Sequence, residues 1–175
     1  QNIRTGSLLP GNAIIRRGCR KSLQMRRLRM AEREEQRMKP IVEICCGSYY
    51  DAKQAALGGA ERIELNSALM LGGLTPTTAT LRMVKRDFPK LKVIAMVRPR
   101  GAGFCYSSED FQVMEAECRE LLENGADGIA FGCLREDASL DQEKMKRMTD
   151  LIKSMDREAV FHRAFDCSAD PFAAA

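Results

Sequence analysis

From residue 40 onward, the sequence repeats one unit, a short apolar run followed by a longer amphipathic run. The apolar runs begin near residues 41, 62, 93, 128 and 159. This spacing of about 21 to 35 residues is the length of a strand, a helix and their connections. Strands that alternate with helices form a parallel sheet covered by those helices. The repeat therefore restricts the fold to a parallel (β/α) barrel or an open doubly wound sheet.

Turn and capping signals set the expected limits of each unit. Ser48 and Asp51 have the spacing of a capping box, and Thr75-Pro76 is typical of an N-cap followed by proline at the first helical position. The expected strands cover residues 40–46, 62–66, 92–98, 128–132 and 158–165. The expected helices cover 48–57, 75–88, 107–124 and 140–155, and a fifth opens at 170–171.

The barrel is the favoured alternative. No Gly-x-Gly-x-x-Gly follows the first expected strand, which disfavours a nucleotide-binding open sheet. We therefore predict an α/β fold, a parallel TIM-type barrel. A complete (β/α)₈ barrel takes about 250 residues and the chain has 175, so we expect it to stop after about five of the eight βα units. Open strand edges favour aggregation, and we expect such a product to be unstable.

Residues 1–38 differ from the rest in composition. They hold ten Lys and Arg against three Glu, a net charge of +7, whereas the whole chain carries +4. The basic charge therefore belongs to this segment and does not indicate a nucleic-acid-binding barrel. We expect a disordered extension. A transit peptide and a nucleic-acid arm are the alternatives, and Met38 is a candidate natural start. The partial barrel is expected over 39–175.

The seven cysteines are odd in number and form no Cys-x-x-Cys pair. This pattern is typical of reduced thiols in a cytoplasmic protein, and no apolar run is long enough to cross a membrane. Five of the thiols fall near strand ends: Cys45, Cys46, Cys105, Cys133 and Cys167. Thiolates suit Cu(I) or Zn, although cysteine also serves as a small buried apolar residue. Because Cys45 and Cys46 are adjacent, at most one of them can enter the barrel.

Charged residues gather at the ends of the expected strands, where a parallel sheet should be apolar. They are Glu43, Glu64, Arg98, Arg100, His162, Arg163 and Asp166. Either they form a structural ion-pair network, or they form a site at the C-terminal rim of the barrel. In the second case Arg98, Arg100, Arg163 and Glu64 would hold an anionic substrate. Glu43, His162 and Asp166 would then be the candidate acids and bases.

Several of these segments together resemble the CutC family of copper homeostasis proteins. They are EIC (43–45), GGAERIEL (58–65), GGLTP (72–76), RPRG (98–101), YS (106–107) and FHRAFD (161–166). The resemblance implies a (β/α)₈ barrel and a role in copper handling. It also implies copper ligands at the ends of the first and second strands. The first position is Cys45, with Cys46 beside it, and the second is Asn66.

Three functions follow as expectations. The first is a cytoplasmic copper homeostasis protein that binds Cu(I) through rim residues. The second is a TIM-barrel enzyme that acts on a small anionic substrate. The third is an inactive truncated product. The expected partner is thus copper or a small anion, with no nucleic acid and no membrane, and a homodimer or larger homo-oligomer is compatible with the sequence.

Overall fold

The computed structural model describes residue 25 and residues 41–174. The predictions for residues 1–38, including Met38 as a start and the thiol of Cys19, lie outside the described residues. Within the described part, no helix is both long and apolar enough to cross a membrane.

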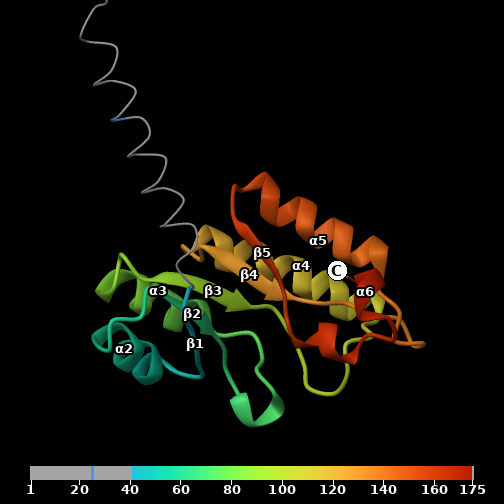
Figure 1. Cartoon of the computed structure of the whole chain (residues 1–175), viewed down its shortest axis with the longest axis horizontal. Helices are drawn as coiled ribbons and strands as arrows, with labels where there is room; N and C mark the ends of the chain where they lie inside the picture. Colours follow the sequence, from blue (N-terminus) through green and yellow to red (C-terminus); the bar gives the residue numbers. More distant parts are fainter. Residues whose placement is uncertain (1–24, 26–40, 175) are drawn as a thin grey trace, which may run out of the picture. The chain divides into compact units, whose positions relative to one another are not determined.

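Five parallel strands form one sheet, and their spatial order follows the chain (Figure 1). They are β1 (Glu43–Cys46), β2 (Arg62–Leu65), β3 (Lys92–Met96), β4 (Gly128–Phe131) and β5 (Glu158–Phe161). A doubly wound sheet reverses its order at a switch point, whereas this order runs in one direction, as in a barrel. The prediction of a partial TIM-type α/β fold is confirmed.

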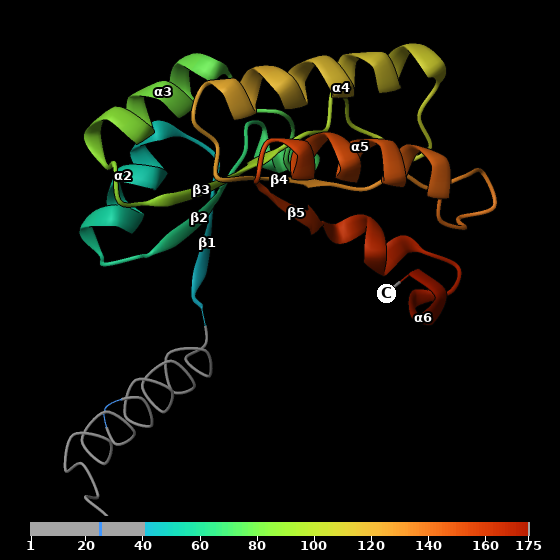
Figure 2. The same cartoon turned by 90° about the horizontal axis from the view of Figure 1, so that it is seen from above.

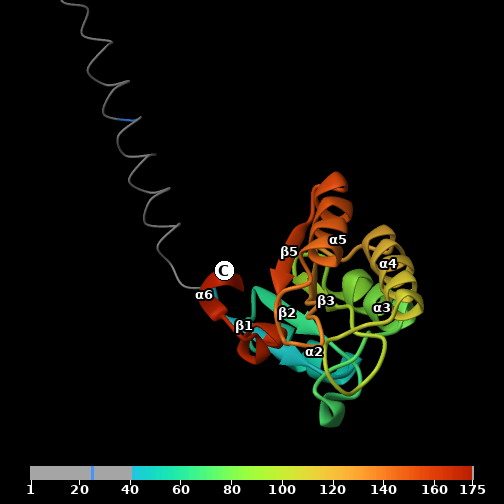
Figure 3. The ribbon, with the colours of Figure 1, turned by 90° about the vertical axis from the view of Figure 1, so that its right-hand side faces the viewer.

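The helices cover one face of this sheet, which we call the outer face (Figures 2 and 3). They are α2 (Tyr49–Leu57), α3 (Thr78–Asp87), α4 (Ser108–Glu123) and α5 (Gln142–Ser154). Outer-face residues such as Ile63, Val93 and Ile129 pack against helix residues such as Leu81 and Met148 in one buried cluster. The opposite, inner face holds a second cluster of Ile94, Met96, Ala130 and Val160. Side chains alternate between these two environments along each strand.

A network of charges joins the first residues of the strands on the inner face. The Arg62 guanidinium on β2 donates to Glu43 on β1 and, at 2.7 Å, to Glu158 on β5. Lys92 Nζ lies 3.5 Å from the Glu158 carboxylate. Because β2 and β5 are not neighbours in the sheet, Arg62 can reach Glu158 only if the sheet curves. The network thus shows barrel-like curvature at the N-terminal ends of the strands.

The predicted caps of α2 and α4 are confirmed, and the predicted cap of α3 is wrong. Ser48 caps α2, and Ser107 forms a capping box with Asp110 at the start of α4. Helix α3, however, begins two residues later than expected, and its cap is Thr77, whose hydroxyl accepts from the Thr80 N–H. Thr75 instead binds Arg98, just after the end of β3.

Thr75 joins three segments of the chain. Its N–H donates to the Arg98 carbonyl at 3.0 Å, and its hydroxyl accepts from the Arg98 N–H at 2.9 Å. The same hydroxyl donates to Glu117 of α4 at 2.7 Å. A threonine fully engaged with a neighbouring strand end cannot also cap a helix, so the next hydroxyl along the chain does so.

The fifth strand is shorter than predicted. It ends at Phe161, and residues Arg163–Cys167 form a 3-10 helix, η2, followed by the short helix α6 (Pro171–Ala174). His162 caps η2, because its Nδ1 accepts from the Ala164 N–H at 3.2 Å. The cap turns the chain away from the sheet immediately after β5, and it fixes the imidazole at the end of that strand.

Replacing Arg62 tests the charge network. Arg62→Met leaves the Glu43 and Glu158 carboxylates together without their shared cation, and we expect it to lower the free energy of unfolding by about 2 kcal/mol. Arg86→Met is the matched control, since the Arg86 side chain is 68% exposed and its loss should cost under about 0.5 kcal/mol. Urea unfolding of both variants checks this, and equal losses would contradict the structural role of Arg62.

Candidate functional site

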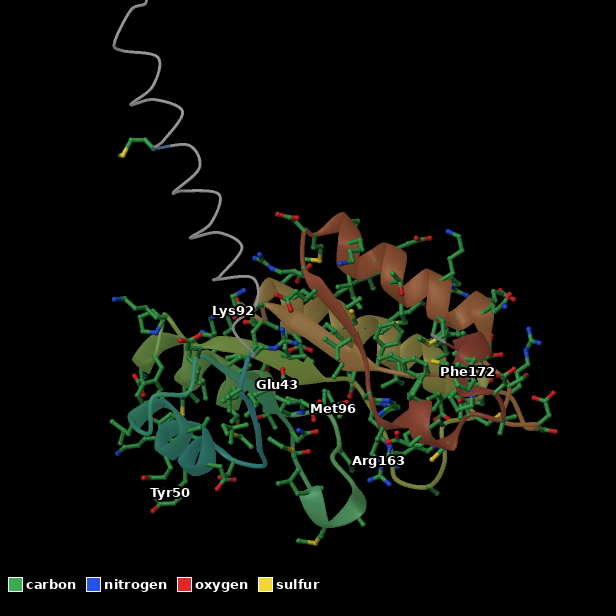
Figure 4. The ribbon with its side chains drawn as sticks, in the orientation of Figure 1. Glu43, Tyr50, Lys92, Met96, Arg163 and Phe172 are labelled. Carbon is green, nitrogen blue, oxygen red and sulfur yellow. The ribbon has the colours of Figure 1, made fainter. Side chains whose placement is uncertain are left out.

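The structure separates the predicted site residues into two ends of the sheet. Arg98, His162 and Arg163 follow the C-terminal ends of β3 and β5, as expected. Glu43 is the first residue of β1 and pairs with Arg62 at the N-terminal end. Figure 4 shows Glu43 near Lys92, whereas Arg163 lies beyond Met96. The expectation that Glu43 joins the rim residues is therefore wrong, because the strand begins at Glu43 rather than ending near it.

One small cluster, Cys45, Glu64 and Asn66, lies on the inner face of β1 and β2. The Asn66 side-chain amide donates to Cys45 Sγ at 3.4 Å and to Glu64 Oε1 at 3.0 Å. Cys45 Sγ lies 3.9 Å from Glu64 Oε1. This Cys45 cluster brings one soft ligand, one carboxylate and one carboxamide together. The predicted binding residue Glu64 thus belongs with the thiol and not with the arginines.

The environment of Cys45 favours the protonated thiol. Partial burial, followed by the charges of Glu64 and Glu43, raises its pKa. A metal ion that binds here must therefore displace a proton. Among residues 41–174, no group of three or more His, Cys, Asp or Glu side chains is arranged to hold a metal ion.

The five thiols lie at or after the C-terminal ends of the strands, as expected, but among the described residues they do not come together as one metal-binding group. Cys46 and Cys133 lie in the outer-face core beneath the helices, because they alternate with inner-face neighbours along their segments. Burial raises the pKa of Cys46 to about 11 and that of Cys133 to about 12. Cys105 and Cys167 are exposed. The prediction that only one of Cys45 and Cys46 enters the barrel is confirmed, and that residue is Cys45.

Arg98 is a buried cation at the end of β3. Its side chain is 4% exposed, and its Nη1 donates to the carbonyls of Leu71 and Gly73 at 2.9 and 3.1 Å. Its Nε is buried without a hydrogen-bond partner. Within residues 41–174, no carboxylate forms an ion pair with this guanidinium.

The guanidinium of Arg163 lies against the loop that follows β2, the same loop whose carbonyls accept hydrogen bonds from Arg98. A Cβ atom at Gly72 would lie 2.4 Å from Arg163 Nη1 and 3.3 Å from Arg98 Nη1. Gly72 also has a φ of +86°, a conformation in which a side chain is unfavourable. Glycine at this position therefore lets the two arginines, from distant parts of the sequence, approach the same point.

His162 is buried beside these cations, with 6% of its surface exposed. Because Nδ1 accepts a hydrogen bond from Ala164, the proton of the neutral ring belongs on Nε2. That atom is buried and has no acceptor. Burial, assisted by the charges of Arg98 and Arg163, lowers the pKa of His162 to about 4. The imidazole is therefore a neutral hydrogen-bond donor at physiological pH.

Phe104 joins Arg98 and His162. Its ring centroid lies 5.1 Å from that of the His162 ring, and the Arg98 Cζ also lies 5.1 Å from it. Neither Phe104 nor Gly72 was predicted as a site residue from the sequence, although Gly72 begins the GGLTP segment (72–76). The available signal was their place in the loops that follow β2 and β3, since such loops form the rim of a (β/α) barrel.

Arg100 does not join Arg98, contrary to the predicted pair of guanidinium groups. Its Nε donates to Asp110 at 2.8 Å, and it lies over the Tyr106 ring with Cζ 5.1 Å from the centroid. The other donors of Arg100 bind carbonyl oxygens of its own loop, those of Gly101, Ala102 and Cys105. Arg100 thus fixes the loop between β3 and α4. Asp166 is exposed on η2.

The fold and the rim define a (β/α)-barrel protein with a polar site at the C-terminal ends of its strands. The model of the CutC family matches residues 40–175. This chain belongs to the CutC family.

Known relatives agree with this assignment. The chain is 48% identical over 138 residues to a CutC family protein of Treponema denticola, covering 78% of this chain and 55% of that protein. It is 41% identical to the human copper homeostasis protein cutC homolog, covering 77% of this chain and 48% of the relative. The chain thus spans about half the length of these relatives.

A solved structure supports the fold independently. A crystal structure of CutC from Streptococcus agalactiae superposes with a TM-score of 0.66 at 26% identity. The match covers 72% of this chain and 60% of that one.

The buried histidine predicts a pH-dependent stability. Between its ordinary pKa of 6.5 and the lowered value of about 4, the unfolded chain binds a proton that the folded chain does not. The free energy of unfolding should therefore fall by about 1 kcal/mol between pH 7.5 and 5.5. His162→Asn keeps a capping acceptor and should remove this dependence. Urea unfolding at both pH values checks it, and an unchanged slope in the variant would contradict the assignment.

Proposed function

We propose that the chain acts in copper homeostasis, as several of its relatives are named, by binding Cu(I) at Cys45. The observation that carries this proposal is the position of that thiol. Of the rim cysteines, Cys45 is the one that is exposed on the inner face of a strand, beside Glu64 and Asn66. Cu(I) selects soft thiolate ligands, and Cys45 is the soft ligand of this cluster.

The atoms of the Cys45 cluster determine how Cu(I) binding should depend on pH and which atom should bind the metal. Cu(I) replaces the thiol proton, so the apparent affinity should rise with pH. Asn66 and Glu64 supply hard nitrogen and oxygen atoms, which suit Cu(I) poorly and act by orienting the sulfur. The described cysteines are all free, which supports a reducing compartment such as the cytoplasm.

Substitution of the thiol tests the copper proposal. Cys45→Ser replaces the soft sulfur with a hard oxygen and should weaken Cu(I) binding at least about tenfold. The measurement is an anaerobic competition titration against a colorimetric Cu(I) chelator.

Cys105→Ser is the matched control for this titration. Cys105 is also an exposed thiol, and it follows β3 rather than lying in the cluster. Its substitution should leave the affinity unchanged. Equal affinities for the wild type and Cys45→Ser would refute binding at Cys45.

A second candidate function is an enzyme acting on a small anionic substrate. It is favoured by the cationic rim of Arg98 and Arg163 around the neutral His162. The Nε2 proton of His162 could be donated to a reacting oxygen, with Asp166 on η2 as a further candidate acid or base. The place of Glu43 at the other end of the strands does not favour a role for it in this chemistry.

A measurement of substrate turnover tests whether the chain is an enzyme. Incubation with a panel of small phosphorylated and carboxylated compounds, followed by NMR of the mixture, should show conversion of one of them. His162→Asn should reduce its rate at least about a hundredfold, the usual contribution of a general acid. Arg86→Met should retain the wild-type rate. A rate that survives in His162→Asn would exclude the imidazole from the reaction.

A further inference from the structure

We propose that Arg98, His162 and Arg163 form a binding site for an oxyanion, the carboxylate or phosphate group of a small molecule. The proposal goes beyond copper homeostasis, since none of these residues belongs to the Cys45 cluster. It also gives a ligand class to the rim without requiring that the bound molecule react.

The first argument is the uncompensated charge of Arg98. A buried ion is costly unless it is paired, and the groups around this guanidinium are neutral: it donates to two carbonyls, and the Tyr106 hydroxyl also interacts with it. The N-terminal end of the sheet provides the contrast within the same chain, because there Arg62 contacts two carboxylates. The rim thus carries a buried cation whose counter-ion is not supplied by residues 41–174.

The second argument is that the buried atoms without hydrogen-bond partners in Arg98 and His162 are both donors. Arg98 Nε and His162 Nε2 are both buried without partners, and each can act only as a donor in its present state. An acceptor is therefore required, and a carboxylate or phosphate provides several oxygen atoms. A metal cation is disfavoured because two guanidinium groups lie at the site and the His162 nitrogen that faces no partner carries a proton.

The third argument is access. Arg163 is exposed, yet its Nη1 lies against Gly72 beside the Nη1 of buried Arg98. A ligand can therefore meet Arg163 from solvent, whereas Arg98 Nε and His162 Nε2 are buried and are reached only if the loop at Gly72 shifts. Guanidinium groups bind carboxylate and phosphate oxygens through paired N–H donors, so this arrangement fits one small oxyanion with its remaining atoms towards solvent.

The wild-type protein contains its own probe, because His162 is the only histidine in the chain. Two-dimensional ¹H–¹⁵N spectra of the imidazole at pH 7.5 should show the neutral ring with its proton on Nε2. Titration with inorganic phosphate, and separately with acetate, should shift the Nε2 signal saturably at constant ionic strength. The anion that binds more tightly, phosphate or acetate, shows whether the site prefers a phosphate or a carboxylate group. A spectrum insensitive to both anions would overturn the proposal.

A pair of arginine variants tests the geometry. Arg163→Gln removes an exposed cation that the fold does not need, and it should weaken binding of the preferred anion about tenfold or more by isothermal titration calorimetry. Arg147→Gln removes an exposed arginine of α5 that pairs with Glu115, and it should leave the affinity unchanged. Equal weakening in both variants would mean non-specific charge attraction and would overturn the site.

A comparison of two variants distinguishes the oxyanion site from the copper site. Cys45→Ser should bind the anion as the wild type does, whereas Arg163→Gln should bind Cu(I) as the wild type does. Loss of anion binding in Cys45→Ser would show that the two sites are one, and would contradict a separate oxyanion site.

Discussion

The alternation of side chains along short parallel strands controls where the polar groups of those strands can lie. The helices fill one face of the sheet with apolar contacts, so a charged residue on a strand has room only on the other face. Near the middle of the strands that face is also apolar, with Ile94, Met96 and Ala130 buried together. Apart from Glu64, which is in register with Ile94, the strand charges therefore lie at the two ends of the strands, and the two ends are used differently.

At the N-terminal end the charges balance, since two cations, Arg62 and Lys92, contact the two carboxylates of Glu43 and Glu158. At the C-terminal end they do not, because Arg98 and Arg163 approach the same glycine and neutral His162 adds a further donor. A balanced network needs no ligand and is explained by the curvature that it stabilises. An unbalanced cluster has a cost that a ligand can offset, which is why the proposed binding site is placed at this end.

The sequence predicts this architecture well because strand and helix periods are local properties. The unit spacing, the caps at Ser48 and Ser107, and the opposite directions of Cys45 and Cys46 all follow from residues within a few positions of one another. The errors concern contacts between distant segments. Glu43 pairs across the sheet with Arg62, Arg100 pairs with Asp110, and Thr75 binds the end of β3. No local pattern distinguishes these partners from free rim residues.

The neutral state of His162 depends on its burial and on the charges of Arg98 and Arg163. Burial of the imidazole, together with the two nearby cations, keeps a third positive charge from forming there. A bound oxyanion would reverse this effect, since a nearby negative charge raises the pKa of a histidine. Anion binding and protonation of His162 would then be coupled, so that each favours the other. The same three residues would thus set both the acid sensitivity of the fold and the pH dependence of ligand binding.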